Sequence, residues 1–270
     1  MKYIIEFKKF IGHLLNNKKL IFTLIKNDFQ KQYLGSYLGL FWAFAQPLTY
    51  MVVIWFVFTY GFRQANTSNG APYFLWLITG MVPWFFFANG LSTGTNAVVG
   101  NAFLVKKVAF RVSILPIVSI GSALLIHLVL ILFLMLCALL YGYMPTFYWL
   151  QIFYYVTLST LFLIGLSWLT ASIRVFIKDI SSFVSVVLQI GFWATPIFWN
   201  VGMIPHKYHW ILNLNPAYYL VEGFRDTFIN KTWFWQKPMD TCSFFIILFI
   251  TFFVGAIVFR RLRPHFGDVL

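Results

Sequence analysis

Long uncharged runs alternate with short basic segments along most of this chain. The first run follows the charged stretch KNDFQK and carries no charge from Tyr33 until Arg63. A helix needs about 20 apolar residues to cross a bilayer. We therefore expect an all-α membrane protein with six transmembrane helices, at about 38–61, 72–99, 114–140, 150–172, 180–199 and 241–259.

The N-terminal segment has a different periodicity. Ile4, Phe7, Ile11 and Leu14 recur at helical spacing, and charged residues occupy much of the remaining surface. This pattern is typical of an amphipathic helix in the membrane interface, and also of a helix packed on a partner subunit. We expect residues 1–31 to form cytoplasmic interface helices and residues 32–270 to form the transmembrane domain.

Two of the predicted spans, and the segment before the last one, have unusual features. Pro47 is expected to kink the first span. The second contains Gly80, Pro83 and several polar residues, which favour a surface facing another helix or a cavity. Residues 213–226 are too short and too polar to span, so we expect a short re-entrant or interfacial helix there.

Composition and charge agree with a membrane protein. Hydrophobic residues make up 60% of the chain and charged residues 10%, and the mean hydropathy is +0.79, whereas a soluble domain carries about 25% charged residues. The net charge is +13. With the N-terminus inside, 15 Lys and Arg fall in inside segments and 5 outside, as the positive-inside rule requires. Topology therefore explains the basic residues better than nucleic-acid binding, and it predicts that both termini are cytoplasmic.

The chain lacks the motifs of an energy-converting site. No GxxxxGK[ST] sequence occurs, so this chain does not itself bind ATP through a Walker loop. No acidic residue falls within a predicted span, whereas ion-coupled transporters usually carry intramembrane carboxylates. We therefore expect no cofactor in this chain and a supply of energy from a partner.

Histidines and cysteines give few candidates for chemistry. His127 is alone in the third span, where we expect a neutral side chain bonded to a neighbouring helix, with a functional role as the alternative. His206 and His209 lack a nearby acidic or Cys ligand, so we expect no metal site. Cys137 and Cys242 are expected to be small core residues.

Aromatic residues make up 21% of the chain, with 33 Phe, 14 Tyr and 11 Trp. Such residues form belts at membrane interfaces. Aromatic faces also stack on sugar rings, whose axial C–H bonds form an apolar patch. Composition leaves both interpretations open.

Five stretches, in order, resemble the membrane subunits of ABC-2-type polysaccharide exporters, which serve O-antigen, capsule and wall teichoic acid export. They are NDFQKQYLGSYLGLFWAFAQPL (27–48), GMVPWFFFANGL (80–91), NAFLVKKVAFRVSILP (101–116), NLNPAYYLVEGFRD (213–226) and FRRLRPHFGDVL (259–270). One departure is Arg111, where members of the family often carry Pro.

The resemblance implies a homodimer in the bacterial inner (cytoplasmic) membrane, bound to two copies of a separate subunit that binds ATP and Mg. A lipid-linked glycan would pass through a channel at the dimer interface. Contacts with the ATP-binding subunit would come from Lys26, Asp28, Phe29, Lys106, Lys107 and Arg111. Channel or gate aromatics would be Tyr33, Tyr37, Trp42 and Phe44. The exit segment would contain Pro216, Tyr218, Tyr219, Glu222, Arg225 and Asp226. The basic residues could equally fix topology alone, and the aromatics could simply pack.

The leading hypothesis is ATP-driven export of a polysaccharide of the O-antigen or teichoic acid type, attached to an undecaprenyl-type lipid, by a subunit without catalytic residues. One alternative is export of a drug or small lipid by the same architecture. Another is a membrane-embedded glycosyl or acyl transferase, because Glu222 and Asp226 lie one helical turn apart, with His206 and His209 nearby.

Overall fold

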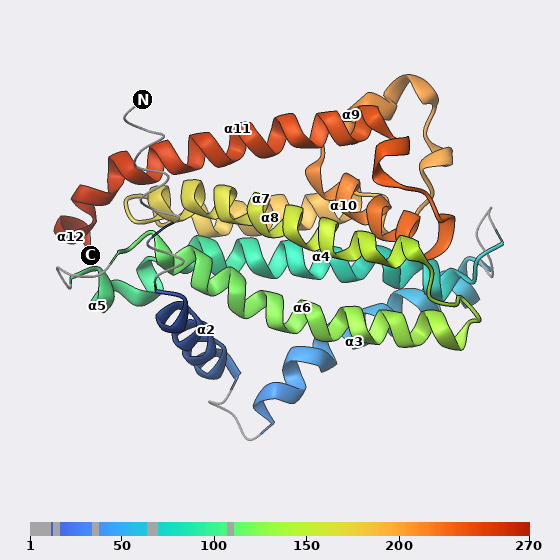
Figure 1. Ribbon diagram of the computed structural model, residues 1–270, viewed down its shortest axis with the longest axis horizontal. Coiled ribbons are helices and arrows are strands. Elements are labelled where there is room, and N and C mark those ends of the chain that lie inside the picture. The colour runs from blue at the N-terminus through green and yellow to red at the C-terminus, as the bar shows by residue number, and fades with distance from the viewer. Residues whose placement is uncertain (1–11, 13–16, 34–37, 64–69, 107–110) are drawn as a thin grey trace.

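The computed structural model describes residues 12, 17–33, 38–63, 70–106 and 111–270, and the described residues form helices without a β-strand. Figure 1 shows most of the long helices lying side by side in one elongated bundle. Its main helices are α2 (Lys18–Tyr33), α3 (Gly39–Phe56), α4 (Tyr73–Asn96), α6 (Ile114–Leu140), α7 (Gln151–Arg174), α8 (Ile180–Ala194), α10 (Pro216–Arg225) and α11 (Pro238–Leu262).

Shorter helical pieces connect these helices. The short α-helices are α5 (Ala102–Val105), α9 (His209–Asn213) and α12 (Phe266–Val269). The 3-10 turns span Val99–Asn101, Phe147–Leu150, Val201–Met203, His206–Tyr208, Phe234–Gln236 and Arg263–His265, and the π-helical turns span Val57–Gly61 and Asp226–Asn230. Helices α5 and α12 lie at one end of the bundle and α9 at the other (Figure 1).

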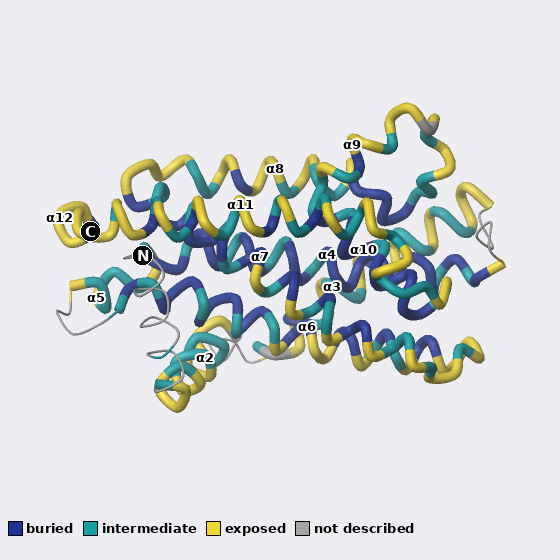
Figure 2. Tube along the Cα trace, turned by 45° about the horizontal axis from the view of Figure 1, so that its top comes forward, coloured by how far each residue is buried: buried dark blue, intermediate teal, exposed yellow. Residues whose placement is uncertain are grey.

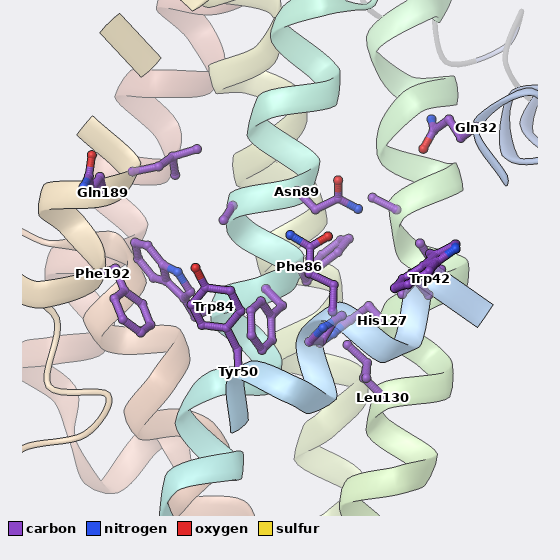
Figure 3. A pocket seen from close by; sticks show the side chains of 18 of the residues that line it. Gln32, Trp42, Tyr50, Trp84, Phe86, Asn89, His127, Leu130, Gln189 and Phe192 are labelled. Carbon is purple, nitrogen blue, oxygen red and sulfur yellow. The ribbon is translucent and has the colours of Figure 1, made fainter. Parts of the chain in front are cut away.

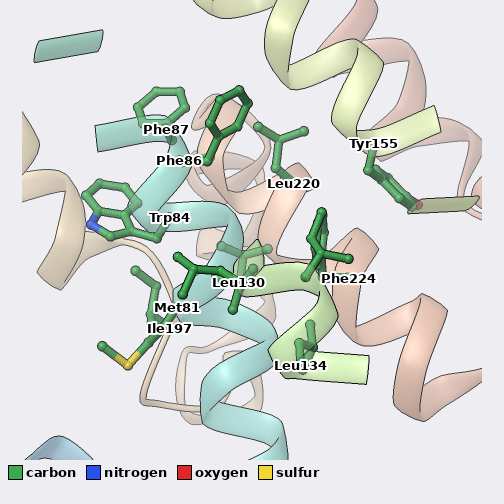
Figure 4. Packing of buried hydrophobic residues seen from close by; sticks show 14 of the residues in the cluster. Met81, Trp84, Phe86, Phe87, Leu130, Leu134, Tyr155, Ile197, Leu220 and Phe224 are labelled. Atoms are coloured by element: carbon green, nitrogen blue, oxygen red, sulfur yellow. The ribbon is translucent and has the colours of Figure 1, made fainter. Parts of the chain in front are cut away.

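Helix α4 is the centre of the bundle. It packs on α6, α7, α8 and α10. Of its most apolar 18-residue stretch, 78% of the residues are buried. Its small residues allow close contacts, since Gly90 meets Leu163 and Gly94 meets Ser167 of α7. Figure 4 shows side chains from α4, α6, α7 and α10 meeting in this core. The expectation that the second span packs against other helices is confirmed.

Within the described ranges, five helices are long and apolar enough to cross a membrane: Phe41–Gly61, Tyr73–Asn96, Ile114–Leu140, Phe147–Arg174 and Pro238–Val269. Helix α8 has 15 residues and is therefore about 22 Å long, less than the ~30 Å hydrocarbon core. The predicted span to Trp199 is wrong at its end. Thr195 adopts an extended backbone (ψ 136°), as expected of a residue that precedes proline.

Helices α2 and α3 lie at the edge of the bundle. Only 11% of the residues in the most apolar 18-residue stretch of the span that contains α3 are buried. Figure 2 shows large exposed stretches on α2 and α8. Helix α2 packs mainly on α6, where the Ser122 hydroxyl donates a hydrogen bond to the Ile25 carbonyl (3.2 Å). The amphipathic helix predicted for residues 3–15 lies outside the described residues, apart from Gly12.

Candidate functional site: a groove lined by aromatic and amide groups

A groove of about 850 Å³ lies between the exposed helices α3 and α8. Helices α4 and α6 form its floor, as Figure 3 shows. Its lining comprises Gln32, Gly39, Trp42, Ala43, Gln46, Pro47, Tyr50, Trp84, Phe85, Phe86, Ala88, Asn89, Ala123, Ile126, His127, Leu130, Leu188, Gln189, Phe192 and Trp193.

Aromatic rings form much of this lining. Trp42 and Trp193 line the groove and are 57% and 60% exposed. Trp84 is buried by comparison, and its ring is 5.7 Å from that of Phe87 and 5.9 Å from that of Phe192 on α8. The aromatic surface therefore continues from α3 across α4 to α8.

Amide side chains supply the polar part of the lining. Gln46, Asn89 and Gln189 come from α3, α4 and α8. Each amide offers an acceptor and two donor protons. Rings that stack on apolar C–H faces, beside amides that bond hydroxyls, suit the two surfaces of a sugar.

His127 lies in the floor of the groove on α6 and is 1% exposed. Its ring stacks on Phe86 with centroids 4.5 Å apart and planes at 8°. Neither ring nitrogen completes a hydrogen bond with the described residues. The Val82 carbonyl of α4, a neighbouring helix as expected, is the backbone group that interacts with the ring, but it does not reach the geometry of a full hydrogen bond.

Among the predicted channel aromatics, Trp42 lines the groove. Phe44 packs against the main hydrophobic core instead. Tyr33 ends α2, and its side chain and the whole of Tyr37 lie outside the described residues. The sequence interpretation did not single out Trp84 or Trp193, although Trp84 lies in the stretch GMVPWFFFANGL that carries the resemblance.

The predicted contact residues for an ATP-binding subunit lie on α2 and beside α5. Lys26 and Lys106 are exposed, Arg111 is half-buried, and Phe29 packs partly against the core. Asp28 accepts a hydrogen bond from Gln32 (2.9 Å). Lys107 lies outside the described residues. The contact role of all six residues stays a prediction.

The predicted exit segment forms α10, which packs on α4 and α11. Asn215 caps its first turn by accepting a hydrogen bond from the Ala217 amide (3.0 Å), and Pro216 occupies the first turn. Tyr219 joins α7 and α11, since its hydroxyl is 3.0 Å from that of Tyr154 and 3.2 Å from that of Thr241. Tyr218 lies beside Glu222 and Asp226.

Arg225 fixes the C-terminal end of α10 in the bundle. It is 2% exposed, and its guanidinium donates to Glu222 (2.5 Å) and to the Ile197 carbonyl (2.8 Å). It also stacks over the ring of Trp76 on α4. Glu222 is thereby committed to an ion pair, which favours a structural role over a catalytic one.

Asp226 forms a second ion pair next to the first, between its buried carboxylate and the half-exposed Lys237. Its carboxylate lies 2.5 Å from the Lys237 ammonium and accepts a hydrogen bond from Asn230 (2.9 Å). Burial raises the pKa of Asp226 above its ordinary value, and Lys237 offsets this only in part. The other groups of the transferase alternative do not converge here: His209 bonds the Ile204 carbonyl, and the side chain of His206 lies outside the described residues.

The cysteines differ from each other. Cys137 is buried in the core, as expected, whereas Cys242 is exposed. The prediction that Cys242 is a core residue is wrong. Cys242 lies near the start of α11, and only 22% of the residues in the most apolar 18-residue stretch of that span are buried.

The sequence of this chain is similar to a protein family and to individual proteins of known name. Residues 19–229 match the model of the ABC-2 type transporter family. The chain is 28% identical over 267 residues to an O-antigen export system permease protein RfbA of Klebsiella pneumoniae, with 98% of this chain and 99% of that protein covered. It is 30% identical over 263 residues to the RfbA protein of Myxococcus xanthus, with 96% and 98% covered.

Proposed function

Since the chain belongs to the ABC-2 type transporter family, we propose that it is the membrane subunit of an ATP-driven exporter that moves a lipid-linked polysaccharide across the bacterial inner membrane. The observation that carries this proposal is the groove between α3 and α8, whose aromatic and amide lining suits sugars. The similarity to O-antigen export permeases over nearly the whole chain supports the same substrate class.

The groove is one half of the proposed channel, and a second copy of this chain closes it. Helix α3 is mostly exposed, and the outer face of α8 exposes Phe183, Val186, Val187 and Ile190. Two such apolar faces bury each other in a homodimer, with the two grooves facing a common path. Helix α8 is the fifth of six crossings in this arrangement, completed by the non-helical segment after Ala194.

Energy comes from two copies of a separate ATP-binding subunit, which docks on the end of the bundle that holds α5 and α12. Lys26, Asp28 and Phe29 on α2, with Lys106, Lys107 and Arg111, form its contact surface. Because α2 packs mainly on α6, we infer that a push on α2 moves the floor of the groove. Such coupling needs two states of a packed element that the partner biases.

The proposal is tested with the complete complex in liposomes. Undecaprenyl-linked glycan should stimulate ATP hydrolysis, and a lectin should detect glycan on the far side of the bilayer only with hydrolysable ATP. If a fluorescent short-chain phospholipid moves and the glycan does not, the small-lipid alternative replaces this proposal.

The dimer arrangement has its own test. On a background without native cysteines, Val53→Cys on α3 should cross-link between two differently tagged copies. Phe253→Cys on α11 is a matched control, since Val53 is 53% and Phe253 61% exposed. If Phe253→Cys cross-links efficiently and Val53→Cys does not, the dimer interface lies on the face that carries α11.

A further inference from the structure

His127 combines three properties that rarely occur together in a membrane helix. It is 1% exposed, it lies among apolar residues of the third long helix, and it borders the groove. Phe86 stacks on one face of its ring, and Phe224 of α10 lies 5.8 Å away. The two phenylalanines hold the imidazole in one orientation without satisfying its nitrogens.

The unpaired nitrogens are costly. A buried polar group without a hydrogen bond loses the interactions that water would give it, and such groups are uncommon in folded proteins. Both Nδ1 and Nε2 of His127 lack a completed bond within the described residues. Even if one nitrogen turned to the nearby Val82 carbonyl, the other would still need a partner.

Phe86 and Phe224 are the rings that contact the imidazole, and His127 is one of the residues that line the groove. His127 lines the same groove as Trp42 and Asn89, which come from α3 and α4 (Figure 3), and its buried ring nitrogens become accessible to a ligand when a lining side chain moves aside. We propose that His127 is a recognition residue of the groove, which forms a hydrogen bond with a hydroxyl of an uncharged sugar in transit. This inference rests on the proposed function.

The chemistry of the lining selects the ligand class. No charged side chain lines the groove in the described part of the chain, so a charged sugar would lose its hydration without gaining an ionic partner. A neutral imidazole offers one donor and one acceptor nitrogen, and a hydroxyl can serve as the partner of either. Asn89 bonds a second hydroxyl, and Trp42 stacks on the ring face.

The test compares His127→Phe, His127→Asn and wild type in the complete complex. Phe keeps an aromatic ring against Phe86 and removes both nitrogens, whereas Asn keeps a donor and an acceptor. The probe is the undecaprenyl-linked glycan extracted from the cells that encode this chain. The measured quantities are the glycan concentration that half-maximally stimulates ATP hydrolysis, the maximal rate and the midpoint of thermal unfolding.

We expect His127→Phe to raise the half-saturating concentration about three- to tenfold, the effect of one lost hydrogen bond, while the unfolding midpoint stays the same or rises. His127→Asn should recover part of the loss. Ser167→Ala is the matched control, since Ser167 is also fully buried with an unpaired hydroxyl but lies outside the groove lining; its half-saturating concentration should match wild type.

An unchanged half-saturating concentration in His127→Phe overturns this inference, and so does a loss that appears together with a lowered unfolding midpoint in both His127 variants. If His127→Phe does not assemble, His127→Leu takes its place, because it also removes both nitrogens, and a wild-type unfolding midpoint with no change in half-saturation in that variant overturns the inference too. A wild-type complex that does not respond to the glycan contradicts the proposed function instead.

Discussion

The guanidinium carbon of Arg225 lies 3.7 Å from the centre of the Trp76 ring, inside the contact between α10 and α4. The same guanidinium bonds Glu222 and the Ile197 carbonyl, so one side chain ties α10, α4 and the segment after α8 together. A flat, always charged group with several donors can do this, and an ammonium cannot.

Replacing Arg225 should therefore destabilise the bundle strongly. Arg225→Met removes one partner of a buried ion pair, which costs about 3 kcal/mol or more, and it also leaves the Ile197 carbonyl unpaired. Arg225→Lys should fall between this variant and wild type. The measurement is thermal unfolding of the purified protein in detergent.

A surface cation–π pair provides the control for Arg225. Lys207 lies 4.7 Å from the ring centre of Tyr208, and both residues are exposed. Lys207→Met should change stability by less than about 0.5 kcal/mol. Equal unfolding midpoints for Arg225→Met and Lys207→Met would show that the buried network does not hold α10 in place.

The sequence predicts most of the long helices because charge and turn residues mark their ends. The prediction of a span at 114–140 agrees with α6, and the following turn contains Gly142 at φ +82°, a conformation that glycine adopts freely. The end of α8 was missed because hydropathy continues through IFW (197–199), whereas Pro196 decides the backbone of Thr195.

The groove could not be predicted from periodicity in the same way. Trp42, Trp84 and Trp193 belong to three helices that are far apart in the sequence, and each alone resembles a membrane-belt residue. Periodicity tells which residues share a face of one helix, but not which faces of different helices meet. The unpaired state of His127 likewise depends on neighbours that only the packing of α4, α6 and α10 supplies.

The ion pair between Asp226 and Lys237 should give stability a defined pH dependence. Burial already raises the pKa of Asp226, and Lys237→Met removes the charge that offsets this, so the pKa rises further. A carboxyl with a raised folded pKa destabilises the folded state increasingly as pH rises through that pKa. The loss of stability in Lys237→Met should therefore be larger at about pH 7.5 than at about pH 4.5.

Thermal unfolding at both pH values measures this effect. The double variant Asp226→Asn with Lys237→Met is the control, because an amide does not titrate, and its difference from Asp226→Asn alone should be the same at both values. A Lys237→Met loss that does not depend on pH would mean that the variant acts through packing rather than through the carboxylate.

The contact between α2 and α6 should transmit the action of the ATP-binding subunit. Ile25 of α2 sits on Gly121, where an added Cβ would lie 2.6 Å from Ile25 Cδ1, so Gly121→Val must push Ile25 aside. We expect glycan-stimulated ATP hydrolysis to fall several-fold while basal hydrolysis persists. Gly267→Val is the control, since its Cβ would meet nothing within 4 Å. Adding Ile25→Ala to Gly121→Val should restore stimulation, and failure of this rescue would argue against the contact as the route.

The exposed tryptophans of the groove should affect transport more than stability. Trp42 and Trp193 present their rings on α3 and α8, and loss of one aromatic contact of about 0.5–1.5 kcal/mol lowers affinity roughly two- to tenfold. Trp42→Ala and Trp193→Ala should each raise the glycan concentration for half-maximal export by this factor, and Trp42→Phe should retain most of the function.

Trp210→Ala is the control, because Trp210 is 61% exposed but lies outside the groove. Equal effects of all three alanine variants would point to a general membrane-interface role of exposed tryptophans, and wild-type export by Trp42→Ala and Trp193→Ala together would remove the groove from the transport path.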